Sequence, residues 1–434
     1  MESLFEYLLS QRSDEPLDPQ SHGLDALLAT DLIERKSPLV LAAGVRGTGK
    51  TSALLNLAKR LDGAIASPKN VLYLRMSDAR ISCTGHASLI DAVDAYLWRF
   101  PDVRKSKLYL VVDDLEYDER WLESFTSLQA VYDIALAGAA AAQSWVDKQR
   151  NGIFPPGTIV HELFPQSACA LGLGEKPLHP DEERTSTQRF GEYFKKGGLI
   201  DLDTPMAAFE IQGQALVADA LLLDVMPRDT RFTYQVVFPF MADVLSSTGR
   251  SFSIASAAER LKSRGARTTR ATLTALLDTA EEARLMRRIG EFHHARNSNS
   301  RMAKMVYASD HGIAQCFCSP SEIDDECIAR TMVFNELMRR NSGSGIETFF
   351  YRTEGNSHVD FALADASSTI TLLASVCFAA PGSRESRNAY AALCEAALET
   401  GVPNAVFLTR DSFDSPSQFA ATPSVMPVHR WLVQ

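Results

Sequence analysis

Hydrophobic and polar positions alternate in blocks between residue 38 and about residue 165. Continuous apolar runs are typical of strands buried on both faces of a parallel sheet, and the amphipathic segments between them are typical of covering helices. Strands are predicted at residues 38–43, 71–74, 108–113, 131–137 and 158–163, and helices at 52–61, 87–100 and 119–128. The alternation predicts an α/β domain built on a parallel sheet.

The rest of the chain has different patterns. Mostly helical patterning precedes the sheet region and also follows it, and the last third mixes helices with strands. In that last third, helices are predicted near 321–341 and 386–400, and strands near 347–351, 359–363, 370–378 and 405–409. We expect an N-terminal helical segment (1–37), a P-loop core (38–165), a helical lid (166–235), a winged helix (236–305) and a C-terminal α/β domain (306–434).

The turn between the first strand and the following helix fits the pattern G-x-x-x-x-G-K-[ST] without a mismatch. It consists of Gly44, Val45, Arg46, Gly47, Thr48, Gly49, Lys50 and Thr51. Its glycines let backbone N–H groups face phosphate oxygens, and the helix N-terminus adds a positive dipole end. Lys50 would reach the β- and γ-phosphates, and the Thr51 hydroxyl would take one Mg²⁺ position. The sequence therefore predicts an ATP site that uses Mg²⁺.

A second motif follows the apolar run at residues 108–112, which ends in Asp113 and Asp114. Asp113 is the predicted partner of Mg²⁺. Asp114 stands where such ATPases usually carry the glutamate that polarises the attacking water. Its side chain is one methylene shorter, and Glu116 is a candidate substitute. Lys50, Asp113 and Asp114 are the predicted catalytic residues, and Thr51 and Asp113 the predicted metal ligands.

Composition indicates a globular chain. Of its 434 residues, 45% are hydrophobic and 23% are charged, which is ordinary for a chain of several domains. No apolar run of about 18 residues is present and the N-terminus is acidic, so we expect a cytoplasmic protein without a membrane span. The seven cysteines have no regular spacing and are expected to be reduced thiols.

Charge is unevenly distributed. The formal net charge is −10, which argues against nucleic acid coating the whole surface. Residues 250–305 nevertheless hold 12 Lys/Arg against 5 Asp/Glu, a net charge of about +7. The same segment predicts a helix, a Gly-containing turn, a second helix and a strand pair, as in a winged helix-turn-helix. Such a fold binds duplex DNA through residues such as Thr268, Thr269, Arg270 and Thr272, or else it serves as a protein-contact module.

These landmarks together resemble a prokaryotic AAA-like ATPase family that joins a P-loop domain to a winged helix and a C-terminal PD-(D/E)XK nuclease-like domain of unknown function. In chain order they are the P-loop, residues 111–114 with a Trp-bearing helix at 120–124, residues 190–198 with a double glycine, residues 304–312 with an Asp-x-Gly turn, and residues 333–337, 350–352 and 359–361. Their order over most of the chain carries the resemblance.

The chain departs from that family at two places. A polar Thr-Gly-Ser cluster usually follows the fourth strand, where this chain has residues 137–142, Ala-Gly-Ala-Ala-Ala-Ala. The resemblance places metal-binding acids at Glu336 and Asp360, but residues 370–378 hold neither the expected acid nor the lysine. We therefore expect nucleotide binding with slow hydrolysis, and no nuclease chemistry.

Two functions from different classes remain open on the sequence. One is an ATPase or slow nucleotide switch that acts with DNA through its winged helix. The other is a nucleotide-binding sensor or scaffold whose partner is another protein or a second copy of the chain. Arg228 and Arg231 are the only arginine-finger candidates that the sequence suggests.

Overall fold

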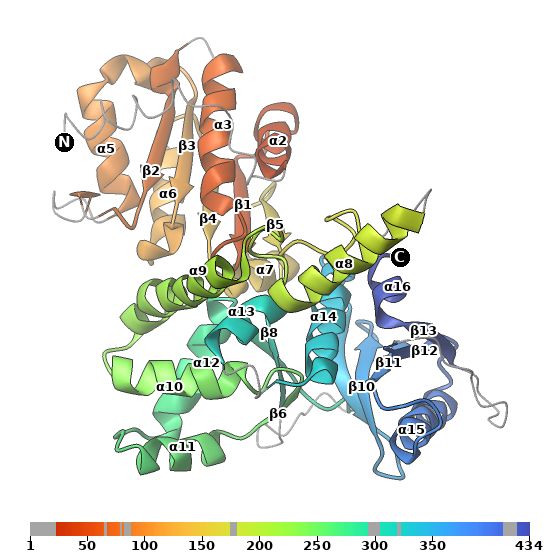
Figure 1. Cartoon of the computed structure of the whole chain (residues 1–434). Coiled ribbons are helices and arrows are strands. Elements are labelled where there is room, and N and C mark those ends of the chain that lie inside the picture. The colour runs from red at the N-terminus through yellow and green to blue at the C-terminus, as the bar shows by residue number, and fades with distance from the viewer. Residues whose placement is uncertain are drawn as a thin grey trace. The chain divides into compact units, whose positions relative to one another are not determined.

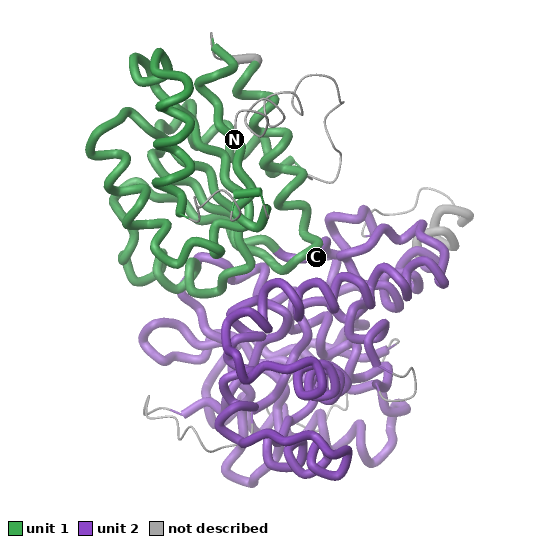
Figure 2. The backbone as a smooth tube through the Cα atoms, turned by 90° about the vertical axis from the view of Figure 1, so that its left-hand side faces the viewer, with its two compact units in different colours: residues 1–163 green, residues 164–434 purple. Residues whose placement is uncertain are grey.

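The computed structural model describes residues 23–64, 67–78, 80–81, 88–173, 180–293, 304–318, 323–410 and 423–434. The chain divides into two compact units, residues 1–163 and residues 164–434 (Figure 2). Most of the predicted N-terminal segment, residues 1–22, lies outside the described residues. The division follows the last strand of the predicted P-loop core.

Unit 1 is built on a five-stranded parallel sheet. Its strands are β1 (Leu39–Gly44), β2 (Val71–Arg75), β3 (Leu108–Asp113), β4 (Ile134–Ala140) and β5 (Ile159–Leu163). Their order is β2-β3-β4-β1-β5 and all neighbours pair in parallel. Strands β1 and β4 lie inside the sheet and are buried along their whole length, which explains their uninterrupted apolar sequences.

Helices cover both faces of this sheet (Figure 1). They are α2 (Leu24–Ala29), α3 (Lys50–Ala64), α5 (Leu89–Arg99), α6 (Trp121–Gln129) and α7 (Gln143–Arg150). Helix α3 contacts β2, β3, β4 and α2. Right-handed crossovers place α5, α6 and α7 on the opposite face, where Trp121 of α6 and Trp145 of α7 pack with ring centroids 5.3 Å apart. The parallel sheet with helices on both faces confirms the predicted fold class.

The fourth strand begins later than the sequence pattern indicates. The prediction was residues 131–137, whereas β4 spans Ile134–Ala140. Residues 131 and 132 instead close the end of α6, because the N–H groups of Val131 and Tyr132 donate to the carbonyl of Leu128. Most of the alanine run therefore lies within the sheet, and Ala141 and Ala142 follow the strand.

Unit 2 begins with α8 (Pro180–Lys196) and α9 (Met206–Asp219), which continues through a π-helical and a 3₁₀ turn to Arg228. Within the described part of the chain, the stretch Met206–Arg228 is the one helix with the length and apolar composition of a membrane span. A helix in the core of a protein can have the same length and apolar composition. Phe209, Val217 and Leu221 are buried, and this stretch contacts α12 and α13 of the same unit.

A module of helices and short strands follows. Its elements are α10 (Tyr234–Leu245), β6 (Arg250–Phe252), α11 (Ile254–Ser263), α12 (Arg270–Glu282), β7 (Met286–Ile289) and β8 (Lys304–Ala308). The strands form an antiparallel sheet in the order β6-β8-β7. Ser253 caps α11 and Thr269 caps α12, each accepting a backbone N–H through its hydroxyl. These caps fix the residues at which the two helices begin.

The C-terminal part holds a five-stranded mixed sheet. Its strands are β9 (Glu347–Arg352), β10 (His358–Ala364), β11 (Ile370–Cys377), β12 (Ala405–Thr409) and β13 (Ser424–Pro427), in the order β13-β12-β11-β10-β9. Its helices are α13 (His311–Phe317), α14 (Asp325–Arg340), α15 (Arg384–Thr400) and α16 (Val428–Leu432). Separate apolar clusters, one with Phe334 of α14 and one with Tyr390 of α15, pack against the sheet from α14 and from α15.

Candidate nucleotide-binding site

The P-loop joins the buried end of β1 to the first turn of α3. Gly47 has φ 95° and Gly49 has φ 79°, values that a residue with a side chain adopts only under strain. Gly44 is fixed by space instead, since a Cβ there would lie 2.7 Å from Thr48 Oγ1 and 2.8 Å from Leu163 Cβ. The backbone conformation therefore requires glycine at positions 47 and 49, and the lack of space requires it at position 44.

Lys50 folds back over the loop that precedes it. Its Nζ donates to the carbonyl oxygens of Gly44, at 2.8 Å, and of Val45, at 2.9 Å. The Thr48 hydroxyl also donates to the Val45 carbonyl, at 2.8 Å. The two carbonyl oxygens thus hold the ammonium group at the loop. From this position the lysine of such a motif reaches the phosphates of a bound nucleotide.

Thr51 and Asp113 meet although 62 residues separate them in the chain. The Thr51 hydroxyl donates to Asp113 Oδ2 at 2.6 Å. Burial raises the pKa of the Asp113 carboxyl, the negative charge of Asp114 raises it further, and Thr51 and Lys50 oppose the rise. A hydroxyl and a carboxylate oxygen suit Mg²⁺, which binds through one or two carboxylates and substrate phosphates.

Asp114 makes different contacts from Asp113. Its backbone is left-handed, with φ 50°, and its Oδ2 accepts from Arg75 Nε at 3.1 Å and from the Ser77 hydroxyl. Arg46 of the P-loop lies 4.0 Å from its Oδ1. The predicted water-polarising carboxylate is therefore held among two guanidinium groups and a hydroxyl. Sequence spacing gave no sign of Arg75 or Ser77, because neither belongs to a motif.

Glu116 lies on the 3₁₀ turn Leu115–Tyr117 that follows β3. Its Oε1 accepts the backbone N–H of Ala141 at 3.0 Å. It shares with Lys50 and Thr51 a cavity of about 160 Å³. The cavity lining comprises Arg46, Gly47, Gly49, Lys50, Thr51, Ser52, Asp114, Glu116 and Ala141. The structure thus brings Arg46, Gly47, Gly49, Lys50 and Thr51 of the motif to one cavity with Asp114 and Glu116. The motif residues Gly44, Val45 and Thr48, and also Asp113, are not among the lining residues.

Residues 190–198 and 304–312, two of the segments that carry the resemblance, contact each other. Asp310 caps α13 by accepting the N–H groups of Gly312 and Ile313 through Oδ1, and its Oδ2 accepts the N–H of Gly198 at 2.7 Å. His311 Nε2 lies 2.8 Å from the carbonyl oxygen of Tyr193. The double-glycine segment and the Asp-x-Gly turn therefore form one structural joint.

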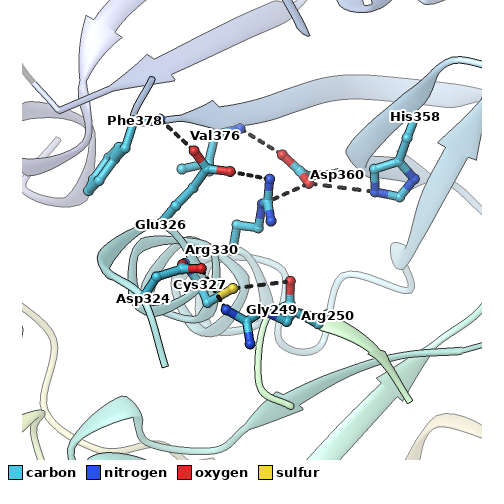
Figure 3. Close-up of polar contacts among 10 residues, drawn as sticks. All are labelled: Gly249, Arg250, Asp324, Glu326, Cys327, Arg330, His358, Asp360, Val376 and Phe378. Atoms are coloured by element: carbon cyan, nitrogen blue, oxygen red, sulfur yellow. Dashed lines mark hydrogen bonds and ion pairs between the residues drawn. The ribbon is translucent and has the colours of Figure 1, made fainter. Parts of the chain in front are cut away.

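The two acids that the resemblance offers as metal ligands, Glu336 and Asp360, are paired with basic side chains. Glu336 pairs with Arg339 and Arg340 of its own helix. Asp360 lies 3.0 Å from Arg330 Nε and 3.6 Å from His358 Nε2, and its Oδ2 accepts the N–H of Val376 at 2.8 Å (Figure 3). Among the described residues, no group of three or more His, Cys, Asp or Glu could hold a metal, a finding that covers Cys316, Cys318 and Cys327 as well.

A second hollow lies between α11 and α12, with a volume of about 760 Å³. Lys262, Arg267 and Arg270 line it together with Arg231, one of the two arginine-finger candidates. Thr272 was predicted to face a DNA groove, but it is only 6% exposed and its hydroxyl bonds to that of Thr269 at 2.9 Å. Thr272 therefore supports the helix cap.

Residues 39–163 have the P-loop, AAA-like fold, defined by the parallel strand order and the loop between β1 and α3. No protein-family model and no curated protein matches the sequence. Among solved structures, the Walker-type ATPase of Pyrococcus abyssi is 13% identical, with a TM-score of 0.39 over 70% of this chain and 97% of that chain. The ORC1 protein of Aeropyrum pernix, in complex with DNA, is 14% identical, with a TM-score of 0.35 over 77% and 97% of the two chains.

Proposed function

We propose that this chain is an ATP-binding AAA-like ATPase, or a slow nucleotide switch, that acts with DNA. The observation that carries the nucleotide part is that Lys50 and Thr51 line one cavity, while the Thr51 hydroxyl donates to Asp113. Mg²⁺, held by Thr51 and Asp113, would neutralise charge on the β- and γ-phosphates. Lys50 would exchange its two carbonyl contacts for phosphate oxygens.

Slow hydrolysis is proposed because polar groups are missing at the end of β4. Residues 137–142, Ala-Gly-Ala-Ala-Ala-Ala, occupy the region where the resembled family carries hydroxyls. Without them, fewer groups fix the γ-phosphate and the attacking water. We expect a turnover of roughly 0.1 s⁻¹ or less, below the 1–100 s⁻¹ typical of kinases.

For the DNA part, we assign residues 234–308 to a winged helix. The order helix, strand, two helices and two strands, with an antiparallel sheet, supports this assignment. The second and third helices then form the helix-turn-helix, with α12 as the recognition helix. Arg270 is the first residue of α12 and is exposed.

The basic residues of this segment fall into two groups, those with an acidic partner among the described residues and those without one. Arg250 pairs with Asp324, Arg260 with Asp243, and Arg288 with Asp278 and Glu281. By contrast, four exposed cations on and beside the α11–α12 turn have no acidic partner among the described residues: Lys262, Arg264, Arg267 and Arg270. The surplus positive charge is therefore concentrated at one edge of the module. This arrangement suits the phosphate backbone of a duplex.

We propose that the C-terminal domain has a nuclease-like fold without nuclease activity. A helix, three strands, a helix and a strand occur in the order α14, β9, β10, β11, α15 and β12. Strand β11 offers no acid and no lysine, and Arg330 lies against Asp360. The domain then serves as a scaffold.

The test is duplex binding at several salt concentrations, by fluorescence anisotropy, with Arg267→Gln/Arg270→Gln compared with the wild type. Each lost phosphate contact lowers the slope of the logarithm of the binding constant against the logarithm of the salt concentration by about 1. The slope of the double variant should therefore be smaller than that of the wild type by about 2. Arg384→Gln/Arg387→Gln on α15 is the matched control, because it removes the same charge from exposed positions. An equal loss in both variants, or no salt-dependent binding by the wild type, would reject the DNA assignment.

The same samples test the second candidate function, a nucleotide-binding sensor or scaffold with a protein partner or a second copy of the chain. That function predicts ATP binding without duplex binding. ATP turnover measured with and without duplex then completes the comparison, because a DNA-coupled switch changes its turnover when DNA is added.

A further inference from the structure

The segment between Arg228 and α10 contributes one basic side chain, that of Arg231, to the hollow between α11 and α12. Asp229 organises this segment. Its Oδ1 accepts the backbone N–H of Arg231 at 2.9 Å, and its backbone carbonyl accepts the N–H of Phe232 at 3.0 Å. Phe232 is buried and anchors the segment. The backbone of Arg231 is therefore fixed, although this residue precedes the module of residues 234–308.

The Arg231 guanidinium is held along one edge. Its Nε donates to both carboxylate oxygens of Asp229, each at 3.0 Å, and its Nη2 donates to Oδ2 at 2.5 Å. Among the described residues, Nη1 makes no hydrogen bond and no ion pair, and 55% of the side chain is exposed. A guanidinium has five N–H donors. Arg231 can therefore bind a phosphate through its other edge while Asp229 holds it in place.

The hollow that Arg231 lines has a surplus of positive charge. Among the described residues, the charged side chains of its lining are those of Arg231, Lys262, Arg267, Arg270 and Glu259. If Asp229 is counted as the partner of Arg231, four cations still face only two carboxylates. Arg270 also begins α12, and the first turn of that helix adds the positive end of its dipole. The hollow therefore suits an anion with more than one negative charge.

We propose that Arg231 contacts a backbone phosphate of the bound duplex, so that the DNA interface extends beyond the winged helix onto the segment that precedes it. This proposal rests on the proposed function, because it adds a phosphate contact to the same site. Arg231 lines one hollow with Arg267 and Arg270, so a strand held by those two residues passes within reach of it. Arg231 is then a contact for DNA and not an arginine finger for ATP.

The experiment measures duplex binding by the full-length protein at several salt concentrations, by fluorescence anisotropy. In Arg231→Gln, the slope of the logarithm of the binding constant against the logarithm of the salt concentration should be smaller than in the wild type by about 1, the effect of one lost phosphate contact. Arg231→Lys keeps the positive charge and should keep the wild-type slope. Arg228→Gln is the matched control, because Arg228 is exposed on the neighbouring turn and is not among the residues that line the hollow.

Adding Arg231→Gln to the double variant Arg267→Gln/Arg270→Gln gives a second reading, because separate phosphate contacts add and the triple variant should lose about 3 from the slope. A wild-type slope in Arg231→Gln, or an equal loss in Arg228→Gln, would overturn the contact. Loss of ATP turnover in Arg231→Gln with unchanged duplex binding would make Arg231 an arginine finger and also overturn it. A wild type without salt-dependent duplex binding would overturn the proposed DNA function itself.

Discussion

Lys50 is the residue on which nucleotide binding most depends. Its ammonium lies over the P-loop carbonyls and is the only lysine among the residues that line the cavity. Lys50→Ala should therefore abolish ATP binding or weaken it severely, as measured by calorimetry. Lys105→Ala is a suitable control, since Lys105 is exposed and pairs only locally with Asp102. Unchanged affinity in Lys50→Ala would contradict the assignment.

Arg330, which is partly exposed, pairs with the buried Asp360, and the effect of this pair on stability depends on pH. Burial opposes ionisation of Asp360, but Arg330, His358 and the Val376 N–H outweigh it and lower the pKa of the carboxyl. A lowered pKa means that Asp360 stabilises the folded state above the ordinary carboxyl pKa, and that this stability is lost as the pH falls through the folded-state value. The free energy of unfolding, measured with denaturant at a series of acid pH values, should fall less steeply with falling pH in Asp360→Asn than in the wild type.

Removing the other partner tests the same pair at neutral pH. Arg330→Met leaves the carboxylates of Glu326 and Asp360 without their shared cation. The loss should be about 3 kcal/mol, toward the low end for a broken buried pair, because Arg330 remains partly exposed. If Arg330→Met unfolds at the wild-type denaturant concentration, the pair contributes little to stability.

At the scale of elements, the joint between residues 190–198 and 304–312 predicts which glycines are essential. A Cβ at Gly198 would lie 2.0 Å from the backbone oxygen of Gln166, whereas a Cβ at Gly191 meets nothing within 4 Å. Gly198→Ala should cost about 1–3 kcal/mol through overpacking, and Gly191→Ala should cost nothing or stabilise α8 slightly. Thermal unfolding of the two variants gives the comparison, and equal midpoints would contradict it.

Elements with strong apolar runs or helix caps could be predicted from the sequence. Strand β3 and strand β12 occur at the predicted residues, because continuous apolar runs are typical of buried parallel strands. Strand β13, α13 and α16 were not predicted, because they are short and are held by pairing or packing with distant segments. Tertiary pairing of this kind leaves no local pattern.

The candidate site, too, could be predicted only in part. The two motifs predict Lys50, Thr51 and Asp113; in the structure Lys50 and Thr51 line one cavity, and Thr51 is hydrogen-bonded to Asp113. The contacts of Asp114 could not be predicted, because they depend on its left-handed backbone and on the ends of β2 and the P-loop. Spacing along a sequence gives no dihedral angles, so these contacts became visible only in the structure.

For the whole molecule, we expect no cleavage of DNA or RNA. Two-metal cleavage requires several oxygen ligands around the ions, and Asp360 and Glu336 are each paired with arginine. Purified protein incubated with supercoiled plasmid, linear duplex and single strands in Mg²⁺ or Mn²⁺ should leave all of them intact. Cleavage that disappears in Asp360→Ala would make the chain an ATP-controlled nuclease.

Strand β8 has a consequence for truncated chains. It is the central strand of the sheet β6-β8-β7, and it leads directly into the Asp310 cap of α13. Phe292, just after β7, also donates its N–H to the carbonyl of Phe350 in β9 at 2.8 Å. A chain that stops at residue 305, or a protease cut there, would therefore leave the module with an incomplete sheet. Deletions meant to separate nucleotide binding from the rest of the chain belong after residue 163, where the two compact units divide.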